Sequence, residues 1–350
     1  MSESKIATDP RIDPRIRAFF GSFDLGERMP DAANREELLA RANTPEAKAV
    51  SKLVTEFFSQ CDREDIAPSD GLTITEYSFV SEPDGNKINL RFIRPDSDEV
   101  LPCVYYIHGG GMASLSAYDG NYRAWGRIIA AQGVAVAMVD FRNCVTASSA
   151  EEVAPFPAGL NDCVSGLRWL AANHAEMRID PSRVVVAGES GGGNLTLATG
   201  LKLLQDGDIG LIAGLYALCP YIAGQWPTPE CPSSVENNGI LLDLHNNHGR
   251  MSYGIEDFER RNPLAWPSFA TEEDVTGLVP TMISVNECDP LRDEGINFYR
   301  LLLRSGVNAR CRQVMGTIHG TEVFPVACPE VSYDTAASIA DFVRRSGQTS

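Results

Sequence analysis

The feature that most constrains the fold is a regular alternation of short apolar, β-rich runs with helical segments, which begins near residue 100. The strand-like runs lie at 102–108, 134–140, 183–188, 212–218, 280–286 and 308–315, and the helical segments at 118–132, 159–174, from residue 190 onward and at 329–345. Two further runs, 72–79 and 87–94, raise the number of expected strands to eight. Continuous apolar strands that alternate with helices form mostly parallel sheets with helices on both faces. We therefore predict an α/β fold with a mostly parallel eight-stranded sheet.

The domain organisation follows from the places where this alternation is interrupted. Residues 1–70 are charged and helical in pattern, with little strand character. Residues 71–219 and 278–350 carry the alternation, so we expect them to form the two parts of the core. Residues 220–277 are rich in Pro, Asn, Gly and Trp and break the pattern. We expect this insertion to pack with residues 1–70 as a helical cap over the sheet.

Charge, cysteine usage and the absence of long apolar stretches indicate which partners and which cell compartment to expect. The formal net charge is -17, and such a surface repels phosphate backbones and anionic lipid headgroups. The chain has nine cysteines, an odd number, and no two of them form a C-x-x-C pair. Several lie in apolar runs, so reduced thiols are favoured over a disulfide framework. The N-terminus has no apolar leader region, and no stretch approaches the roughly 20 apolar residues of a membrane span. We expect a cytoplasmic protein with no nucleic-acid or membrane partner.

A candidate nucleophile lies in the sequence Gly-Glu-Ser-Gly-Gly at 188–192, which is a G-x-S-x-G motif. An expected strand precedes it and an expected helix follows it. This setting is the one that a nucleophile elbow requires, because the sharp turn needs glycine where a Cβ would clash. The alternative is a glycine-rich turn or a phosphate loop, but the motif lacks the lysine of a P-loop and the spacing of a dinucleotide fingerprint. Ser190 is therefore the predicted nucleophile.

A second glycine-rich motif, His-Gly-Gly-Gly at 108–111, directly follows a strand upstream of the elbow. Consecutive glycines allow backbone N–H groups to approach a ligand closely, as an oxyanion hole demands. We expect Gly110, Gly111 and Gly191 to supply the donors, and His108 and Gly109 to hold the loop in shape. The alternative is a flexible loop without this role.

The acid that would orient a catalytic base is expected just after the end of a strand. Asp289 follows the run at 280–286, where a loop side chain can reach back towards the active site. Asp293 is expected to be the N-cap of the next helix, and Glu287 is a more distant contender. We therefore prefer Asp289 as the acid.

The predicted base is the last of the five histidines, His108, His174, His245, His248 and His319. His174 lies at a helix end, where a solvated or capping role is the simplest reading. His245 and His248 could form a metal pair, but no cysteine or carboxylate cluster nearby completes a site, so we expect no metal. Only His319 lies downstream of the predicted acid, and the resulting order of serine, aspartate and histidine is that of α/β-hydrolases.

Taken together, these motifs resemble the hormone-sensitive-lipase-like branch of the α/β-hydrolases, the bacterial family IV esterases. Within this branch the chain is most similar to the brefeldin A esterase type. The resemblance rests on the segments 108–112, 155–159 with Asp162, 188–194, 262–270, 289–295 and 319–320. It implies an α/β-hydrolase fold with a helical cap, hydrolysis of carboxylic esters and no cofactor, and it allows a homodimer.

The chain departs from this family pattern at four positions. Glu189 and Gly191 stand where Asp and Ala are commoner, Met112 replaces the usual aromatic residue, and Thr321 replaces a frequent Phe. Because these positions lie near the acyl or alcohol pocket, we regard Met112, Glu189 and Thr321 as candidate substrate-pocket residues.

The sequence thus predicts a serine carboxylesterase that hydrolyses small-molecule esters with short- to medium-chain acyl groups through an acyl-enzyme intermediate. Activity is expected to fall as pH drops through a histidine pKa of about 6–7. Lactone or amide cleavage by the same triad is one alternative. A non-catalytic small-molecule receptor of the same fold is another, although the receptors of this kind lack the catalytic histidine.

Overall fold

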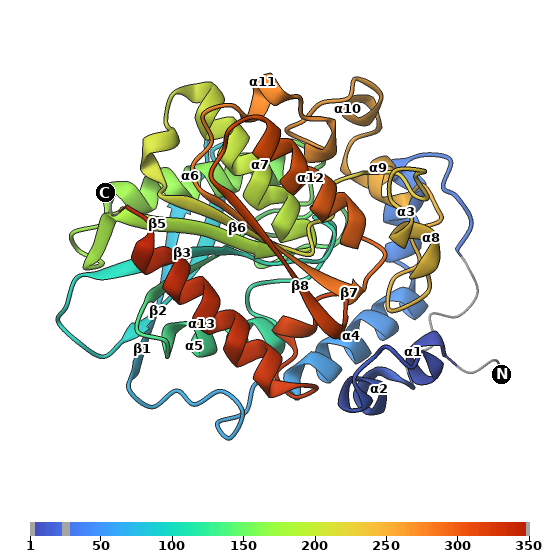
Figure 1. Ribbon diagram of the computed structural model, residues 1–350, viewed down its shortest axis with the longest axis horizontal. Helices are drawn as coiled ribbons and strands as arrows, with labels where there is room; N and C mark the ends of the chain where they lie inside the picture. Colours follow the sequence, from blue (N-terminus) through green and yellow to red (C-terminus); the bar gives the residue numbers. More distant parts are fainter. Residues whose placement is uncertain (1–3, 23–28, 348–350) are drawn as a thin grey trace.

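The computed structural model describes residues 4–22 and 29–347, and its centre is one eight-stranded sheet (Figure 1). The strand order is β1-β2-β4-β3-β5-β6-β7-β8, and only β2 runs against the others. The strands are β1 Leu72–Val80, β2 Lys87–Pro95, β3 Leu101–Ile107, β4 Ala135–Asp140, β5 Ile179–Glu189, β6 Gly214–Leu218, β7 Thr281–Cys288 and β8 Ala309–Ile318. The predicted fold class, a mostly parallel eight-stranded α/β sheet, is confirmed.

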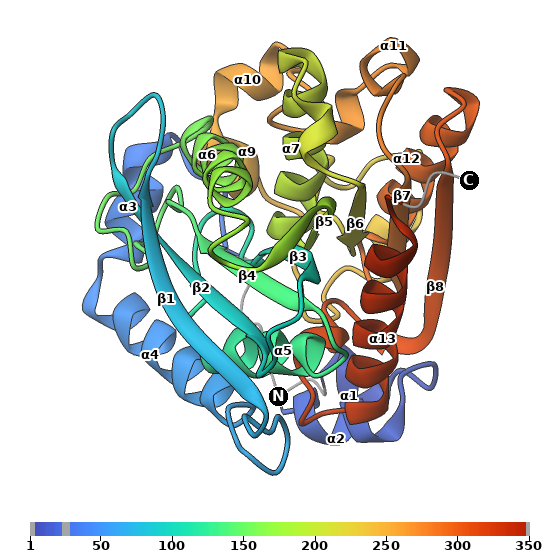
Figure 2. The same ribbon diagram turned by 90° about the vertical axis from the view of Figure 1, so that its left-hand side faces the viewer.

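Helices cover both faces of the sheet (Figure 2). One face carries α5 (Gly120–Ala130) and α13 (Pro329–Arg345), and the other carries α6 (Ala158–Ala172), α7 (Gly191–Asp206) and α12 (Arg292–Arg304). Side chains of β3 alternate between the two layers, as the two-residue period of a strand requires. Tyr105 and Ile107 join the core under α6 and α7, whereas Val104 and Tyr106 join the core under α5 and α13.

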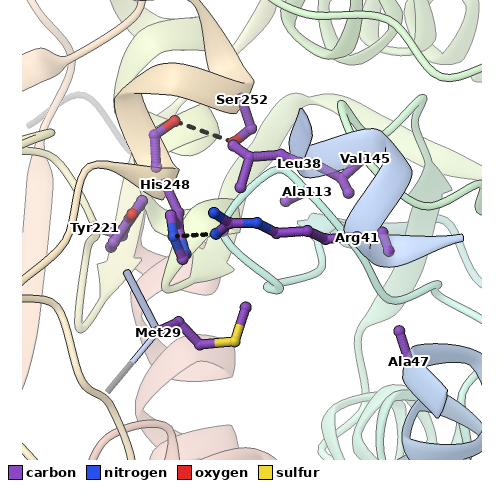
Figure 3. Close-up of a pocket in the computed structure, with 12 residues that line it drawn as sticks. Met29, Leu38, Arg41, Ala47, Ala113, Val145, Tyr221, His248 and Ser252 are labelled. Carbon is purple, nitrogen blue, oxygen red and sulfur yellow. Dashed lines mark hydrogen bonds between the residues drawn. The ribbon is translucent and has the colours of Figure 1, made fainter. Parts of the chain in front are cut away.

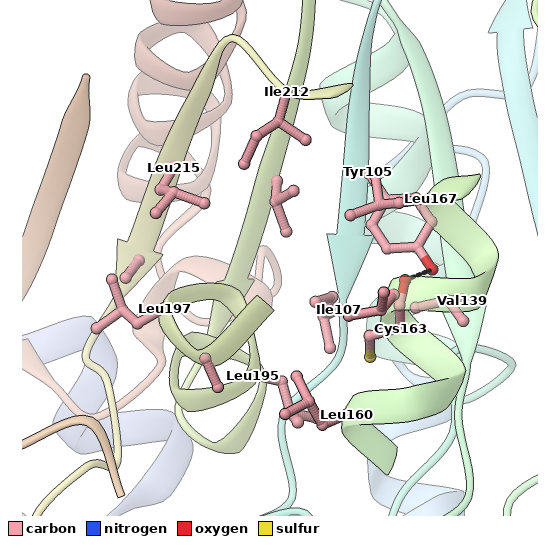
Figure 4. Packing of buried hydrophobic residues seen from close by; sticks show 14 of the residues in the cluster. Tyr105, Ile107, Val139, Leu160, Cys163, Leu167, Leu195, Leu197, Ile212 and Leu215 are labelled. Atoms are coloured by element: carbon pink, nitrogen blue, oxygen red, sulfur yellow. Dashed lines mark hydrogen bonds between the residues drawn. The ribbon is translucent and has the colours of Figure 1, made fainter. Parts of the chain in front are cut away.

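The core under α6 illustrates how the layers are held together (Figure 4). Leu160, Cys163 and Leu167 of α6 are buried in the same cluster as Tyr105 and Ile107 of β3. Burying one such large apolar side chain contributes about 1.5–3 kcal/mol. The Tyr105 hydroxyl is also buried, and it donates a hydrogen bond of 3.0 Å to the backbone carbonyl of Cys163. This bond satisfies a polar group that burial alone would destabilise.

In its described residues, the N-terminal segment forms the helices α1 (Lys5–Thr8), α2 (Pro14–Phe20), α3 (Arg35–Ala42) and α4 (Pro45–Ser59). The helical pattern at 34–60 is divided between α3 and α4. The break has a physical cause: Pro45 lacks an N–H and disfavours helical geometry in the residue before it. That residue, Thr44, instead caps the new helix by accepting a hydrogen bond from the Ala47 N–H.

The insertion between β6 and β7 contains the short helices α8 (Ser233–Glu236), α9 (His248–Tyr253), α10 (Ile255–Glu259) and α11 (Glu272–Val275) and the 3-10 turn η2 (Pro267–Phe269). Its first part meets the N-terminal segment, where α3 and α9 lie side by side (Figure 1). The Asn247 side chain accepts from the Ala32 N–H and donates to the Ala32 carbonyl, both at 2.8 Å. The later part packs on α7 and α12. Two further 3-10 turns are η1 (Ile209–Leu211) and η3 (Thr321–Val323).

All nine cysteines are free, and eight of them are buried. Burial raises the pKa of several of these thiols, for example that of Cys103 to about 12. Such thiols stay protonated and behave as small apolar side chains. Within the described ranges, no helix is long and apolar enough to cross a membrane.

Candidate active site

The candidate nucleophile lies on a tight turn between β5 and α7. Ser190 has φ 58° and ψ -119°, a conformation that costs a side-chain-bearing residue about 1–3 kcal/mol. Its backbone N–H is held by the carbonyl of Leu218 on β6 at 3.0 Å. The turn can close only because its flanking residues are glycines: a Cβ on Gly188 would lie 2.5 Å from the Ile107 carbonyl oxygen, and one on Gly192 would lie 2.0 Å from it. The sequence Gly-x-Ser-x-Gly is therefore a steric requirement of this backbone.

Three loops at the carboxyl edge of the sheet bring the predicted triad residues together. Ser190 follows β5, Asp289 follows β7 and His319 follows β8. His319 Nε2 lies 2.8 Å from Ser190 Oγ, and His319 Nδ1 lies 2.8 Å from Asp289 Oδ2. Asp289 is fully buried and His319 is 6% exposed, so the line of three side chains opens to the outside at its serine end.

Asp289 and the two other candidate acids, Glu287 and Asp293, have different hydrogen-bond partners in the structure. Asp289 Oδ1 accepts a hydrogen bond from the Leu291 N–H at 2.9 Å, which fixes the carboxylate facing His319. Glu287 instead accepts from the Gly316 N–H. The prediction that Asp293 caps the following helix is wrong. Helix α12 begins at Arg292, one residue earlier, so Asp293 lies in the first turn and accepts from the Ser233 N–H at 2.6 Å.

The electrostatic environment of His319 differs from the ordinary one assumed in the sequence analysis. Burial opposes the charged imidazolium, but the negative charge of Asp289 outweighs it, so the pKa of His319 lies well above 6.5. Hydrogen bonding to Asp289 acts in the same direction. The protonated imidazolium form of His319 is therefore favoured near pH 6.5. The neutral imidazole, which can accept a proton, prevails only at a pH above the raised pKa.

The loop at 108–111 places free backbone N–H groups beside the serine. Gly110 and Gly111 have φ values of 92° and 64°, which favour glycine. Within the described part of the chain, their N–H groups have no hydrogen-bond acceptor. Gly191, the residue after the nucleophile, lies directly against this loop, because a Cβ built on it would be 2.7 Å from the Gly111 nitrogen. The three predicted oxyanion-hole glycines are thus neighbours.

His108 is buried behind the loop and takes no part in the line of triad side chains. Its ring stacks on Phe141 with centroids 4.3 Å apart, and its Nε2 lies 3.4 Å from Asp140 Oδ1. Asp140 in turn accepts hydrogen bonds from the N–H groups of Ala117 and Ser149, both at 2.7 Å. Through Asp140, these contacts connect the start of the loop to the end of β4 and to the segments that contain Ala117 and Ser149.

A cavity of about 340 Å³ opens next to Gly111 (Figure 3). Its walls are mainly apolar and come from three parts of the chain: the N-terminal segment, the oxyanion loop region and the insertion after β6. The lining residues are Met29, Leu38, Arg41, Ala42, Ala47, Gly111, Ala113, Val145, Tyr221, His248, Gly249 and Ser252. Figure 3 shows the Arg41 guanidinium in contact with the His248 ring in the wall of this cavity, with Arg41 Nη1 3.4 Å from His248 Nε2.

Comparison with known proteins places the chain in a family. Residues 104–323 match the family described as the alpha/beta hydrolase fold. The structure of brefeldin A esterase, a bacterial homologue of human hormone-sensitive lipase, is 33% identical and superposes with a TM-score of 0.83 over 98% of both chains. The chain is a hormone-sensitive-lipase-like α/β-hydrolase. The family predicted from the sequence motifs is confirmed.

Two further relatives extend this comparison. The structure of esterase Est22 is 67% identical and has a TM-score of 0.97, covering 98% of this α/β-hydrolase and 100% of Est22. Carboxylesterase NlhH of Mycobacterium tuberculosis is 29% identical over 353 residues, which is 98% of this chain and 99% of NlhH. The similarity therefore extends over the N-terminal helices and the insertion as well as over the core.

The three candidate substrate-pocket residues of this α/β-hydrolase do not line the cavity in Figure 3. Met112 is buried, and its carbonyl accepts from the Cys144 N–H. Thr321 is also buried, and its hydroxyl accepts from the Ile318 N–H at 3.1 Å. Glu189 is 3% exposed and hydrogen-bonds to two tyrosines. The structure gives all three a place in the scaffold behind the loops.

Sequence reasoning missed the residues that do form the cavity walls. Arg41 and His248 lie 207 positions apart in the chain, and Tyr221 belongs to the loop after β6. The only available signal was the expectation that the N-terminal segment and the insertion pack together. No sequence period identifies which of their side chains meet around this cavity.

The remaining histidines and the cysteines bear on metal binding. His245 Nε2 lies 2.8 Å from the Ser234 carbonyl and His248 Nε2 2.8 Å from the Pro30 carbonyl, so the two rings point to different partners. Over residues 4–22 and 29–347, the side chains close enough to share an ion are Cys219, Asp289 and His319, whose ligand atoms lie within 4.8 Å of one another. Both ring nitrogens of His319 already face hydrogen-bond partners, so an ion there would displace these contacts.

Proposed function

We propose that this α/β-hydrolase is a serine carboxylesterase that cleaves small-molecule esters with short- to medium-chain acyl groups through an acyl-enzyme intermediate. Ser190 is the nucleophile, His319 the general base and acid, and Asp289 the group that orients and stabilises the imidazole. The observation that carries the proposal is the line of two 2.8 Å contacts from Asp289 through His319 to Ser190. This line ends beside the loop of Gly110 and Gly111, whose N–H groups have no hydrogen-bond acceptor among residues 4–22 and 29–347.

The relatives support the general activity. Est22 and brefeldin A esterase are esterases, and NlhH is a carboxylesterase. All three are similar to this chain over nearly its whole length. The chain is a carboxylic-ester hydrolase of this family, and the mechanism and substrate range below are our proposal.

Acylation begins when Ser190 Oγ attacks the carbonyl carbon of the ester and His319 Nε2 accepts the hydroxyl proton. The electron pair of the C=O bond moves onto the carbonyl oxygen. The N–H groups of Gly110, Gly111 and Gly191 then donate to this oxyanion, and one such donor typically contributes about 3–4 kcal/mol. When the tetrahedral intermediate collapses, the ester C–O bond breaks, His319 protonates the leaving alcohol and the acyl group stays on Ser190.

Deacylation repeats the sequence with water. His319 accepts a proton from a water molecule, whose oxygen attacks the acyl carbon and generates a second oxyanion in the same site. Collapse breaks the bond to Ser190 Oγ, which takes back the proton from His319 as the carboxylic acid leaves. Asp289 keeps Nδ1 of the ring protonated throughout, so that Nε2 faces the reacting atoms.

The apolar cavity beside Gly111 sets the proposed range of acyl groups. Leu38, Ala42 and Val145 provide apolar walls, and the side chains of Arg41 and His248, which are in contact with each other, add polar groups to the lining. A volume of about 340 Å³ accommodates a small acyl chain, and a long one would have to leave the cavity. We therefore expect kcat/KM for p-nitrophenyl esters to rise from acetate to butyrate or octanoate and to fall for palmitate. A maximum at palmitate would contradict this assignment.

We further propose that the N-terminal helices and the segment holding α8 and α9 form a cap over the site. The two segments are joined by the paired hydrogen bonds between Ala32 and Asn247 and by the hydrogen bond from Lys5 Nζ to the Asn238 carbonyl. Residues from both line the cavity. A cap built in this way determines which ester reaches the nucleophile.

The nucleophile assignment is tested by covalent labelling. A fluorophosphonate probe should modify the wild-type enzyme at a single peptide containing Ser190, identified by mass spectrometry. Ser190→Ala should not be labelled, and His319→Gln should be labelled far more slowly because its serine lacks a base. Labelling of Ser190→Ala at the wild-type rate would place the nucleophile elsewhere.

A further inference from the structure

The carboxylate next to the nucleophile has a structural position that the mechanism above does not use. Glu189 is the last residue of β5, directly before Ser190, and its side chain is 3% exposed. Tyr106 of β3 donates its hydroxyl to Glu189 Oε2 at 2.6 Å, and Tyr122 of α5 donates to Oε1 at 2.5 Å. Burial raises the pKa of the Glu189 carboxyl, and the hydrogen bonds from the two phenols, which favour its ionised form, offset part of this effect.

Tyr122 extends this contact to the oxyanion loop. The Gly109 N–H donates to the Tyr122 hydroxyl oxygen at 3.0 Å. A phenol has one proton, and here it points to Glu189, so the oxygen lone pairs are left to face Gly109. The chain from Gly109 N–H through Tyr122 to Glu189 therefore has a fixed direction.

Gly109 is also in close contact with the carboxylate itself. A Cβ on Gly109 would lie 2.1 Å from Glu189 Oε1, so the loop backbone rests directly on this side chain. The next two residues, Gly110 and Gly111, carry the N–H groups proposed to bind the oxyanion. One buried carboxylate thus connects the strand that carries the nucleophile to the loop that carries the donors.

We propose that Glu189 and Tyr122 are a positioning pair that aims the oxyanion-hole N–H groups at the site where negative charge develops, through the hydrogen bond from Gly109. This proposal rests on the serine-esterase function proposed above. Because the oxyanion forms only during reaction, loosening the loop reduces transition-state stabilisation more than it reduces ester binding. The expected signature is a loss of kcat with little change in KM.

Tyr122→Phe and Tyr106→Phe form a matched pair of variants for the test. Each removes one buried phenol that donates to Glu189, but only Tyr122 also accepts from Gly109. With p-nitrophenyl butyrate, Tyr122→Phe should lower kcat by about 10- to 100-fold and change KM by less than about threefold. Tyr106→Phe should lower kcat by less than about threefold. Thermal unfolding should show comparable losses of Tm for the two variants.

Glu189→Gln provides a second, nearly isosteric test. Glutamine offers one acceptor and one donor, so one of the two phenols must reverse its hydrogen bond. We expect a kcat more than threefold below that of the wild type but above that of Tyr122→Phe, again at nearly constant KM. A boronic acid that forms a tetrahedral adduct with the active-site serine should bind Tyr122→Phe more weakly by about the factor lost in kcat.

Equal kcat losses in the two phenylalanine variants, or a change confined to KM, would overturn the positioning role. Should Tyr122→Phe fail to fold, Glu189→Gln decides: a kcat within threefold of the wild type would overturn the proposal. Ser190→Ala, measured in parallel, separates this failure from that of the proposed function. Activity retained in Ser190→Ala would refute the serine mechanism, whatever the tyrosine variants do.

Discussion

The buried ion pair between Arg142 and Asp162 supports the loop that follows β4, and its removal should destabilise the whole domain. Asp162 is fully buried, and Arg142 is 2% exposed. The carboxylate accepts from Ser81 Oγ at 2.6 Å and from the Arg142 backbone N–H, Nε and Nη2, each at 2.9 Å. Burial opposes the charged guanidinium, but its hydrogen bonds to Asp162 and Asp84 hold the pKa of Arg142 above its ordinary value.

Replacing Asp162 by Asn keeps the shape of the side chain but removes the only fully buried carboxylate that pairs with Arg142 among the described residues, and leaves the guanidinium with half-exposed or exposed partners. Breaking a buried pair in this way costs about 3–5 kcal/mol. For a chain of 350 residues the entropy of unfolding is about 0.7 kcal/mol/K, so Tm should fall by about 4–7 °C. Urea unfolding followed by tryptophan fluorescence measures the free energy, and thermal unfolding measures the shift in Tm.

The same arginine provides the control. Asp84 also bonds Arg142 Nη2, at 2.6 Å, but its side chain is 40% exposed. Water screens this contact, so Asp84→Asn should cost less than about 1 kcal/mol. The reasoning fails if Asp162→Asn costs less than 1 kcal/mol, or if the two variants lose equal stability.

Four further predictions concern the active site. Because the proposed mechanism requires neutral His319 and the pKa of this residue lies well above 6.5, kcat/KM should rise with pH through that raised value, whereas a profile flat from about pH 5 to 9 would contradict the assignment. In stability the sign is opposite: charged His319 stabilises the fold fully below pH 6.5, and this contribution, seen in Tm against pH, is lost as pH rises through the folded-state pKa. Gly192→Ala places a Cβ 2.0 Å from a backbone oxygen of β3 and should cost at least about 3 kcal/mol in urea unfolding, whereas Gly210→Ala, with no atom within 4 Å, should be nearly neutral. Leu38→Trp should fill part of the cavity and lower kcat/KM for p-nitrophenyl octanoate at least tenfold more than for the acetate, and equal losses would place the acyl chain elsewhere.

The fold was predictable because its determinants are local. The apolar run at 134–140 contains β4, and the run at 280–286 overlaps β7, because continuous β-rich segments between helices have few other solutions. The turn at Ser190 was equally accessible, since its glycines are required by the backbone itself. The first residue of α12 was harder to predict. Asp293 is a residue type that often caps helices, but its tertiary hydrogen bond from the Ser233 N–H holds it within the first turn of α12.

The parts of the site in which side chains from distant segments of the chain meet could not be predicted. Glu189 was expected in the substrate pocket because it departs from the family pattern at a position near the acyl or alcohol pocket, yet its side chain turns towards the face of the sheet that carries α5. Its partners Tyr106 and Tyr122 come from a neighbouring strand and from a helix, and no spacing in the chain relates the three. The raised pKa of His319 likewise results from burial next to a charge, which only the three-dimensional arrangement determines.

The most direct test of the central claim is the steady-state hydrolysis of p-nitrophenyl butyrate by the wild-type enzyme and by Ser190→Ala. We expect turnover by the wild type and a loss of about 10⁴-fold or more in kcat for the variant, whose circular dichroism and Tm should remain those of the wild type. A folded Ser190→Ala protein that keeps more than a tenth of the activity would contradict the assignment of Ser190 as the nucleophile.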